Sequence, residues 1–398
     1  MLTQAERAGK TYLYDCLRGP FNNIVYVGLM TLALLIAIRY HEAPSWVKSI
    51  ICSGESLGRA ITPITLYFGF RLALPTAWLA SLYMLATALF LLIAAFASSL
   101  LLYTIGIVLA YILFAQPLQL MLQIYSKNYT ADERGSRVST MFFISLIIGS
   151  LSAHFFGKWL DIDIQHFQWQ FVILAVSAVI SACFLAKIPS TPLDSHACGN
   201  PWQNFSLIWK DKLFGWMIAA YIILGIGTAM VVPIKIEYMA DPQFKINASN
   251  LNITLINVII PAISMIVSTK IWGYIFDKFN FIKTRLLVNA CFIASFLTFF
   301  TSTNIVILGL SSVLNGFALS GGMLIWSLWV TKIAPSEKTP AYMSAHSAAS
   351  GLKGLIAPAT GYAVLSFKDP IAVGVTAATL MLLSCIMFFV VRNNPQIK

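Results

Sequence analysis

Two consecutive stretches of the chain contain no charged side chain: Leu72–Ala97, LALPTAWLASLYMLATALFLLIAAFA, and Ser99–Tyr125, SLLLYTIGIVLAYILFAQPLQLMLQIY. A helix needs about 20 predominantly apolar residues to cross a bilayer, and each stretch exceeds that length. Only Ser98 separates them, so the second helix has to return antiparallel to the first. The pair therefore predicts a hairpin of two transmembrane helices.

The composition of the whole chain agrees with this hairpin. Of 398 residues, 58% are apolar and 10% are charged, and the mean hydropathy is +0.79. A soluble protein carries about 45–50% apolar and about 25% charged residues. The charge is too scarce to cover a soluble surface, which excludes a soluble enzyme, a disordered chain and a secreted disulfide scaffold.

Runs of spanning length continue along the chain and predict an all-α polytopic membrane protein with twelve transmembrane helices. They are 20–39, 44–68, 72–97, 99–125, 138–160, 168–188, 213–236, 249–275, 285–302, 304–331, 340–366 and 370–391. The longest linker, 189–212, divides them into two sets of six. We therefore expect an N-terminal six-helix bundle over 1–188, a cytoplasmic linker over 189–212 and a C-terminal six-helix bundle over 213–398.

The distribution of Lys and Arg predicts the orientation in the membrane. Most of the 26 basic residues fall in segments on the same side as the N-terminus. Membrane proteins keep Lys and Arg on the cytoplasmic side, so both termini are expected in the cytoplasm. The same rule accounts for the net charge of +11 without a nucleic-acid partner. The short loops indicate a cell inner (plasma) membrane.

One loop carries a motif. Residues 272–278 read WGYIFDK, and Lys283 and Arg285 follow on the inner side. This segment resembles the G-x-x-x-D-[RK] loop signature of the major facilitator superfamily of secondary transporters. Gly273 is expected to allow a tight turn at the helix end, and Asp277 then reaches a helix N-terminus or an Arg.

Other short segments are similar to the same family. Asp132–Gly135 precedes the fifth run, and Ala334-Pro335 precedes the eleventh. Three features depart from the family: residues 67–71 lack the acidic residue of the motif, the fourth run lacks an Arg, and the fifth lacks a Gly-Pro core. These departures argue against multidrug antiport. The resemblance implies two bundles around a central cavity, with the second and eleventh helices facing each other.

Ionisable residues in the middle of the predicted spans are the main site candidates. Glu55 and Arg59 lie one turn apart in the second run, and Lys353 shares a face with His346 in the eleventh. A charge at the centre of a spanning helix costs about 2.5–3.5 kcal/mol, so such residues are expected to face protein or water. The resemblance implies that Glu55, Arg59 and Lys353 can meet, bind an anionic solute and carry a proton. The alternative is a structural Glu55–Arg59 pair, with Lys353 snorkelling to the interface.

Uncharged polar and aromatic residues extend the candidate site. They are Tyr26, Gln119, Asn257, Asn315 and Trp326. An amide that faces lipid leaves its donors unsatisfied, so these side chains are expected to point inward. They can equally connect neighbouring helices. Two further lysines, Lys235 and Lys270, lie near span ends and are expected to snorkel.

The loop motif also suggests a conformational latch. Gly273, Asp277 and Lys278 would hold the inner face of one half against Arg134 and Arg137 of the other. Alternating access needs contacts of this kind that can break. The simpler interpretation is that Asp277 only caps the loop.

These features together predict a secondary transporter that works by rocker-switch alternating access. We expect a monomer in the lipid bilayer that takes up a small polar or anionic substrate with protons. The alternatives are a multidrug or metabolite efflux antiporter and, from another class, a polytopic membrane enzyme or sensor. The chain has no Walker loop, no H-E-x-x-H and no G-x-S-x-G, so we expect no enzyme activity, no cofactor and no metal.

Overall fold

The computed structural model describes residues 3–193, 201–334, 339–367 and 369–394, and nearly all of them are helical. The chain divides into two compact units, unit 1 over Met1–Gly199 and unit 2 over Asn200–Lys398. This boundary lies inside the predicted linker.

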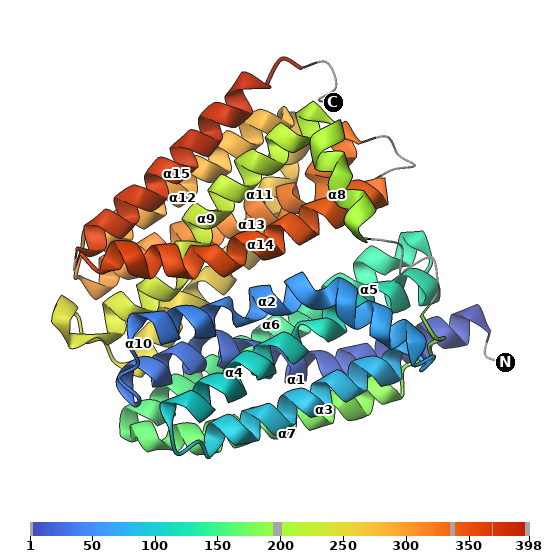
Figure 1. Cartoon of the computed structure of the whole chain (residues 1–398), viewed down its shortest axis with the longest axis horizontal. Helices are drawn as coiled ribbons and strands as arrows, with labels where there is room; N and C mark the ends of the chain where they lie inside the picture. The colour runs from blue at the N-terminus through green and yellow to red at the C-terminus, as the bar shows by residue number, and fades with distance from the viewer. Residues whose placement is uncertain (1–2, 194–200, 335–338, 368, 395–398) are drawn as a thin grey trace. The chain divides into compact units, whose positions relative to one another are not determined.

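The helices of each unit appear in Figure 1. Those of unit 1 are α1 Gln4–Arg39, α2 Ser45–Arg71, α3 Thr76–Ala95, α4 Leu100–Phe114, α5 Gln116–Asn128, α6 Ala131–Ile162, η1 Ile164–His166 and α7 Phe167–Ala186. Those of unit 2 are α8 Pro201–Lys210, α9 Lys212–Ala240, η3 Pro242–Phe244, α10 Asn250–Thr254, η4 Leu255–Ile259, α11 Ile260–Lys278, α12 Phe281–Phe300, α13 Ile305–Ile333, α14 Thr339–Leu365 and α15 Pro370–Val390.

The predicted spans correspond to long helices. Among the described residues, ten helical segments are apolar and long enough to cross a membrane. The exceptions among the long helices are α2 and α14, which carry the ionisable candidates, and each has 27 residues. At about 1.5 Å per residue both exceed the roughly 30 Å of the hydrocarbon core. The ten spans and the helical content of the described residues confirm the all-α polytopic fold, and α2 and α14 have the length that the predicted total of twelve requires.

The first helix is longer than predicted. The apolar run suggested a start at residue 20, but α1 begins at Gln4 behind a capping box formed by Thr3, and Pro20 lies inside the helix. Hydropathy placed the start too late because the first turns are polar. Asp15 and Arg18 of these turns are nevertheless buried within unit 1.

Two prolines interrupt predicted runs. Pro117 lies in the first turn of α5 and separates it from α4. Pro261 begins α11, directly after the π-helical turn η4. Proline lacks an N–H and its ring crowds the carbonyl four residues earlier, here that of Asn257. A wider turn accommodates this clash, and such π turns are frequent at functional sites.

Small residues let the helices approach closely. In unit 1, α3 packs along α7 and α2 along α4, and in unit 2, α9 packs against α14 and α15 (Figure 1). A Cβ at Gly58 of α2 would collide with the backbone of Ile112 in α4, and one at Gly361 of α14 would collide with the backbone of Met230 in α9. Close packing through small residues is typical of helix contacts in membranes.

The outward faces are strongly apolar. Phe142, Phe143 and Phe155 of α6 are 53%, 50% and 65% exposed. Soluble proteins rarely leave such side chains in contiguous patches, whereas lipid tails accommodate them. The chain is therefore a multi-pass membrane protein.

Candidate substrate and ion-coupling site

Glu55 and Arg59 form an ion pair in the middle of α2. The guanidinium of Arg59 donates to Oε1 of Glu55 across one helical turn. The side chain of Glu55 is 21% exposed and that of Arg59 is 50% exposed, so the pair is not fully buried inside unit 1. Half-exposed opposite charges in a spanning helix separate at lower cost than a fully buried pair. The pair itself fits both the structural and the functional interpretation given above.

Two tyrosines lie within electrostatic reach of this pair. Tyr26 of α1 interacts electrostatically with both Glu55 and Arg59. Its ring stacks on Phe114 at 6.4 Å, and the side chain is 41% exposed. Tyr111 of α4 also lies within electrostatic reach of Glu55. Three of the predicted site residues, Tyr26, Glu55 and Arg59, therefore come together in unit 1.

A second group gathers in unit 2 and consists of Tyr221, Trp326, Trp329 and His346, which we call the aromatic group. The ring of His346 lies 5.1 Å from each tryptophan and 5.4 Å from Tyr221. Tyr221 and Trp329 stack at 4.7 Å. The group joins α9, α13 and α14, and it includes two predicted site residues, Trp326 and His346.

Three polar atoms of the aromatic group lack hydrogen-bond partners within the described part of the chain. They are the hydroxyl of Tyr221, Trp329 Nε1 and His346 Nε2, and the two nitrogens are considered first. Buried polar groups are nearly always bonded to protein, water or a ligand, so each exception calls for an explanation. The indole nitrogen is a donor only, and a neutral imidazole can donate from the same Nε2. An acceptor oxygen would satisfy both.

Cations flank the aromatic group. Lys353 lies two turns beyond His346 on α14 and interacts with it electrostatically. The Lys353 side chain runs across Gly225 of α9, where a Cβ would collide with it. Arg285 of α12 is 2% exposed and lies 5.5 Å above the Tyr221 ring. Unit 2 therefore combines positive charge, stacked rings and unpaired donors.

The amide candidates have separate environments. Asn257 lies in the π turn η4, where Nδ2 donates to the carbonyl of Ile253 at 3.0 Å. Gln119 and Asn315 are half-buried in α5 and α13.

Buried charges in unit 1 escaped the sequence analysis. Asp15 and Arg18 of α1 pair at 2.8 Å and are 1% and 6% exposed. The hydroxyl of Tyr125 donates to Asp15 Oδ2 at 2.7 Å. Both residues precede the predicted first span, 20–39, and the i,i+3 spacing of opposite charges was the only available signal of their pairing.

One expectation about lysines in unit 2 is wrong. Lys235 does not snorkel: it is 4% exposed, its Nζ lies 3.3 Å from Ser312 Oγ, and it lies 4.4 Å above the ring of Phe299. The reason is that α9 continues to Ala240, so Lys235 is inside the helix bundle and not at its end. Lys270 is exposed, and its snorkelling stays a prediction. Arg285 was also placed at the inner surface and is buried instead.

The predicted latch is only partly described. Gly273 does not form a turn at a helix end, because α11 continues to Lys278 and a Cβ at 273 would meet no atom within 4 Å. Arg137 pairs with Glu133 at 2.9 Å within unit 1. The side chain of Asp277 lies outside the described residues.

The remaining latch residues have their own contacts. Arg134 of α6 donates to the carbonyl of Ser126 at 3.2 Å. The Nζ of Lys278 lies 4.4 Å above the ring of Tyr274 within α11. The latch therefore stays a prediction.

The helical architecture and the buried polar residues together indicate what kind of membrane protein this is. Two units of six spanning helices, with ionisable and unpaired polar side chains inside them, are characteristic of a membrane transporter and not of an enzyme. A family model described as Major Facilitator Superfamily matches residues 60–304 and 220–398, and the chain belongs to this family.

Solved structures of transporters share this fold. A mutant of the nucleoside transporter NupG superimposes with a TM-score of 0.77 at 15% identity, covering 96% of this chain and 99% of that one. The human organic anion transporter MFSD10 (TETRAN) gives 0.65 at 12% identity over 96% and 99%. A D-xylose-proton symporter gives 0.62 at 15% identity over 94% and 96%. A search of curated protein sequences finds no match.

Proposed function

We propose that this transporter takes up a small polar or anionic solute together with protons by rocker-switch alternating access. The observation that carries the proposal is the Glu55–Arg59 pair, half-exposed in the middle of a spanning helix. A charge costs free energy at that depth, and ionisable residues that persist there mark substrate or proton pathways.

The pair provides a simple coupling device. A proton on Glu55 removes its negative charge and releases Arg59 from the pair. Arg59 can then donate to an anionic or strongly polar group of the solute. When the solute leaves, the carboxylate loses its proton and pairs with Arg59 again. Tyr26 adds a hydroxyl next to both side chains.

The aromatic group would contact the solute through unit 2. Trp329 Nε1 and His346 Nε2 can donate to an acceptor oxygen, and the rings suit the face of a sugar or a base. Two of the similar solved structures are a nucleoside transporter and a D-xylose-proton symporter. The expectation that Lys353 joins Glu55 and Arg59 at one site stays a prediction.

The oligomeric state, the membrane and the topology are proposed from the sequence. We propose a monomer in a cell inner membrane with both termini in the cytoplasm, as the distribution of Lys and Arg predicts. Efflux of aromatic compounds is the second candidate function, favoured by the stacked rings of the aromatic group.

Transport by the purified protein tests the proposal. In proteoliposomes with an imposed pH gradient, a panel of nucleosides, sugars and small carboxylates should include one solute that accumulates. Glu55→Gln is expected to abolish accumulation against a gradient but to retain solute exchange, because only the proton carrier is lost.

Asp132→Asn is the matched control, since it neutralises an exposed carboxylate at the start of α6. Normal gradient-driven accumulation by Glu55→Gln would contradict the coupling role. Accumulation that occurs only with the opposite pH gradient would favour efflux.

A further inference from the structure

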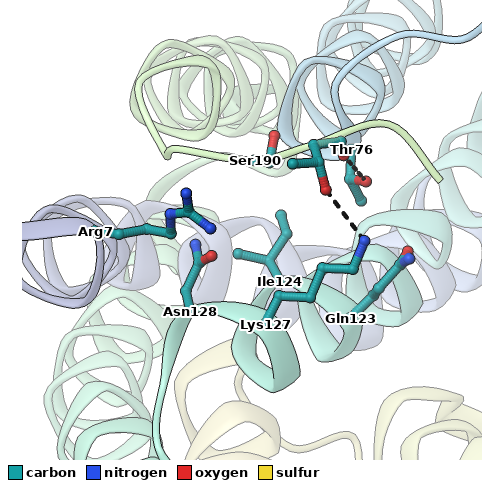
Figure 2. Close-up of a pocket in the computed structure, with 8 residues that line it drawn as sticks. Arg7, Thr76, Gln123, Ile124, Lys127, Asn128 and Ser190 are labelled. Carbon is teal, nitrogen blue, oxygen red and sulfur yellow. Dashed lines mark hydrogen bonds between the residues drawn. The ribbon is translucent and has the colours of Figure 1, made fainter. Parts of the chain in front are cut away.

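Arg285 of α12 carries a buried positive charge without a counterion. Its side chain is 2% exposed, and no described carboxylate pairs with it. Two cations of unit 1 differ: Arg18 pairs with Asp15 at 2.8 Å, and in the polar pocket of Figure 2 the Nζ of Lys127 lies 3.1 Å from Thr191 Oγ1. A guanidinium stays protonated in proteins, so loss of a proton cannot remove its charge. A buried ion without a partner is strongly destabilising, which indicates that an anion from outside the described chain belongs here.

The side chains next to this guanidinium fix its position but do not neutralise it. Nε of Arg285 donates to Asn289 Oδ1 at 3.0 Å, and Nδ2 of Asn289 lies 3.2 Å from Cys385 Sγ of α15. The electrostatic neighbours of Arg285 are Tyr221 and Cys385, and neither a phenol nor a thiol is an anion at neutral pH in its ordinary form. The contact with Asn289 uses one of the five N–H groups, so the Nη atoms remain for Tyr221 and for a ligand.

Tyr221 of α9 brings a hydroxyl to the same guanidinium. Its side chain is 3% exposed, Cζ of Arg285 lies 5.5 Å from the centre of its ring, and the two polar groups interact. The hydroxyl oxygen can accept from the guanidinium, but the hydroxyl proton has no acceptor within the described residues. An acceptor oxygen beside Arg285 would satisfy this donor.

Three rings hold Tyr221 in this position. Trp329 of α13 stacks on it at 4.7 Å, and His346 of α14 and Phe388 of α15 contact it at 5.4 Å and 5.2 Å. Close packing on several sides leaves a side chain little freedom to change its rotamer. The hydroxyl is therefore oriented before any ligand binds.

We propose that Arg285 and Tyr221 bind a carboxylate-type oxyanion inside unit 2, either the carboxylate of the transported solute or that of a soluble anion that is not transported. The planar guanidinium matches the two oxygens of a carboxylate, and the phenol adds a hydrogen bond to one of them. The bound anion neutralises the buried charge. In the first case the inference rests on the proposed function and narrows the solute to a carboxylic acid.

Thermal unfolding of the full-length protein in detergent tests this site. Formate and acetate replace chloride at constant ionic strength, and acetamide serves as the neutral counterpart of acetate. A ligand that binds the folded state raises the midpoint of unfolding with its concentration. We expect formate or acetate to raise the midpoint of the wild type, and acetamide to leave it unchanged.

Variants assign the effect to the two residues. Arg285→Gln should lose the shift, and without carboxylate it should be at least as stable as the wild type, because it removes a buried charge that has no counterion. Tyr221→Phe keeps the ring contacts and loses only the hydroxyl, so it should weaken binding about tenfold. Lys283→Gln is the matched control, because it removes an exposed cation two residues away on the same helix and should respond like the wild type.

Transport distinguishes the two sources of the carboxylate. Acetate should competitively inhibit exchange of the solute that the proteoliposome panel identifies, measured without a pH gradient, if that solute places its own carboxylate in the site. A shift of the unfolding midpoint without inhibition indicates a soluble anion that is not transported. The unfolding experiment requires no transported solute, so a failure of the proposed function does not affect its result.

Two results overturn the proposal. One is a wild-type protein whose unfolding midpoint rises with neither formate nor acetate beyond the effect of acetamide. The other is an equal shift in the wild type and in Arg285→Gln or, where that variant does not fold, in Tyr221→Phe.

Discussion

The position of the Lys353 side chain depends on Gly225 of α9, which has no side chain of its own. The methylenes and ammonium of the lysine cross α9 at Gly225, and every other residue at that position would place a Cβ in their path. A long charged side chain inside a helix bundle needs such a channel, since both its apolar stem and its head must be accommodated. The position of this cation is therefore decided by a neighbour on another helix.

Gly225→Ala tests this dependence. The new Cβ meets the flexible end of Lys353, so the lysine moves while the backbone stays. We expect the unfolding midpoint to change by only a few degrees. Transport of the solute that the panel identifies should fall at least about tenfold, which corresponds to the loss of one charge-assisted hydrogen bond. Gly9→Ala is the control, because a Cβ there meets no atom within 4 Å. Unchanged transport by Gly225→Ala would show that the position of Lys353 does not matter.

The buried pair of α1 leads to a stability prediction. Asp15→Asn leaves Arg18 as a buried charge without its carboxylate, which should cost about 3–5 kcal/mol of unfolding free energy. The measurement is unfolding of the purified variant in detergent. The double variant Asp15→Asn/Arg18→Gln should recover part of the loss, because it removes the uncompensated charge. Equal stability of Asp15→Asn and the wild type would contradict the argument.

At the scale of elements, the turn between α1 and α2 is the clearest case of packing that a hydropathy pattern does not show. His41 lies in this turn, outside the spans, with its ring 4.5 Å from Tyr103 of α4 and 4.9 Å from Tyr40. Its Nε2 is buried without a partner in the described structure, and burial lowers the pKa of this imidazole below 6.5. Burial in this turn therefore favours the neutral form of the His41 imidazole over its charged form.

A pH dependence of stability follows. Well above pH 6.5 His41 is neutral in both the folded and the unfolded chain, so its protonation does not reduce the stability of the fold. As the pH falls below 6.5 the unfolded chain takes up the proton first, and stability declines until the lower folded pKa is reached. His41→Gln should reduce the change of the unfolding midpoint with pH over this window. His166→Gln, in the turn before α7, serves as the control. An equally steep decline in His41→Gln would assign the effect to another group.

The helices α2 and α14 show the limits of predicting elements. Both were located from the sequence, yet neither is among the apolar spans, because Glu55, Arg59, His346 and Lys353 lower their hydropathy. Their length of 27 residues is nevertheless sufficient to cross a bilayer. The start of α1 was placed too late for the same reason, since hydropathy ends where polar residues begin and a helix does not.

At the scale of the whole molecule, transport requires two units that change their relation to each other. Alternating access in this family's architecture is largely a rocking of one bundle against the other. The latch that would limit such a motion is a prediction from the motif at 272–278 and not from packing. Arg137 already has a partner inside unit 1, so a latch through it would have to compete with Glu133.

The latch prediction is tested by conformation rather than by stability. Asp277→Asn should shift the balance of inward-open and outward-open states, measured by the labelling of single cysteines near either end of the helices. Lys270→Gln, an exposed charge change on the same helix, is the control. An unchanged labelling pattern in Asp277→Asn would leave the residue with a local capping role.

The amino-acid pattern was sufficient to predict a transporter of this class, the position of nearly every span and the division into two halves, because a bilayer imposes length and hydropathy on each helix independently of its neighbours. It also placed Glu55 and Arg59 on one face, since that follows from the helical repeat alone. The burial of individual charges, in contrast, depends on the packing of the helices against one another. The sequence does not show on which side of a helix the charges of Asp15, Lys235 and Arg285 lie. The helices that pack around these residues determine their burial. The unpaired nitrogens of Trp329 and His346 belong to the same category, because a missing partner exists only in three dimensions.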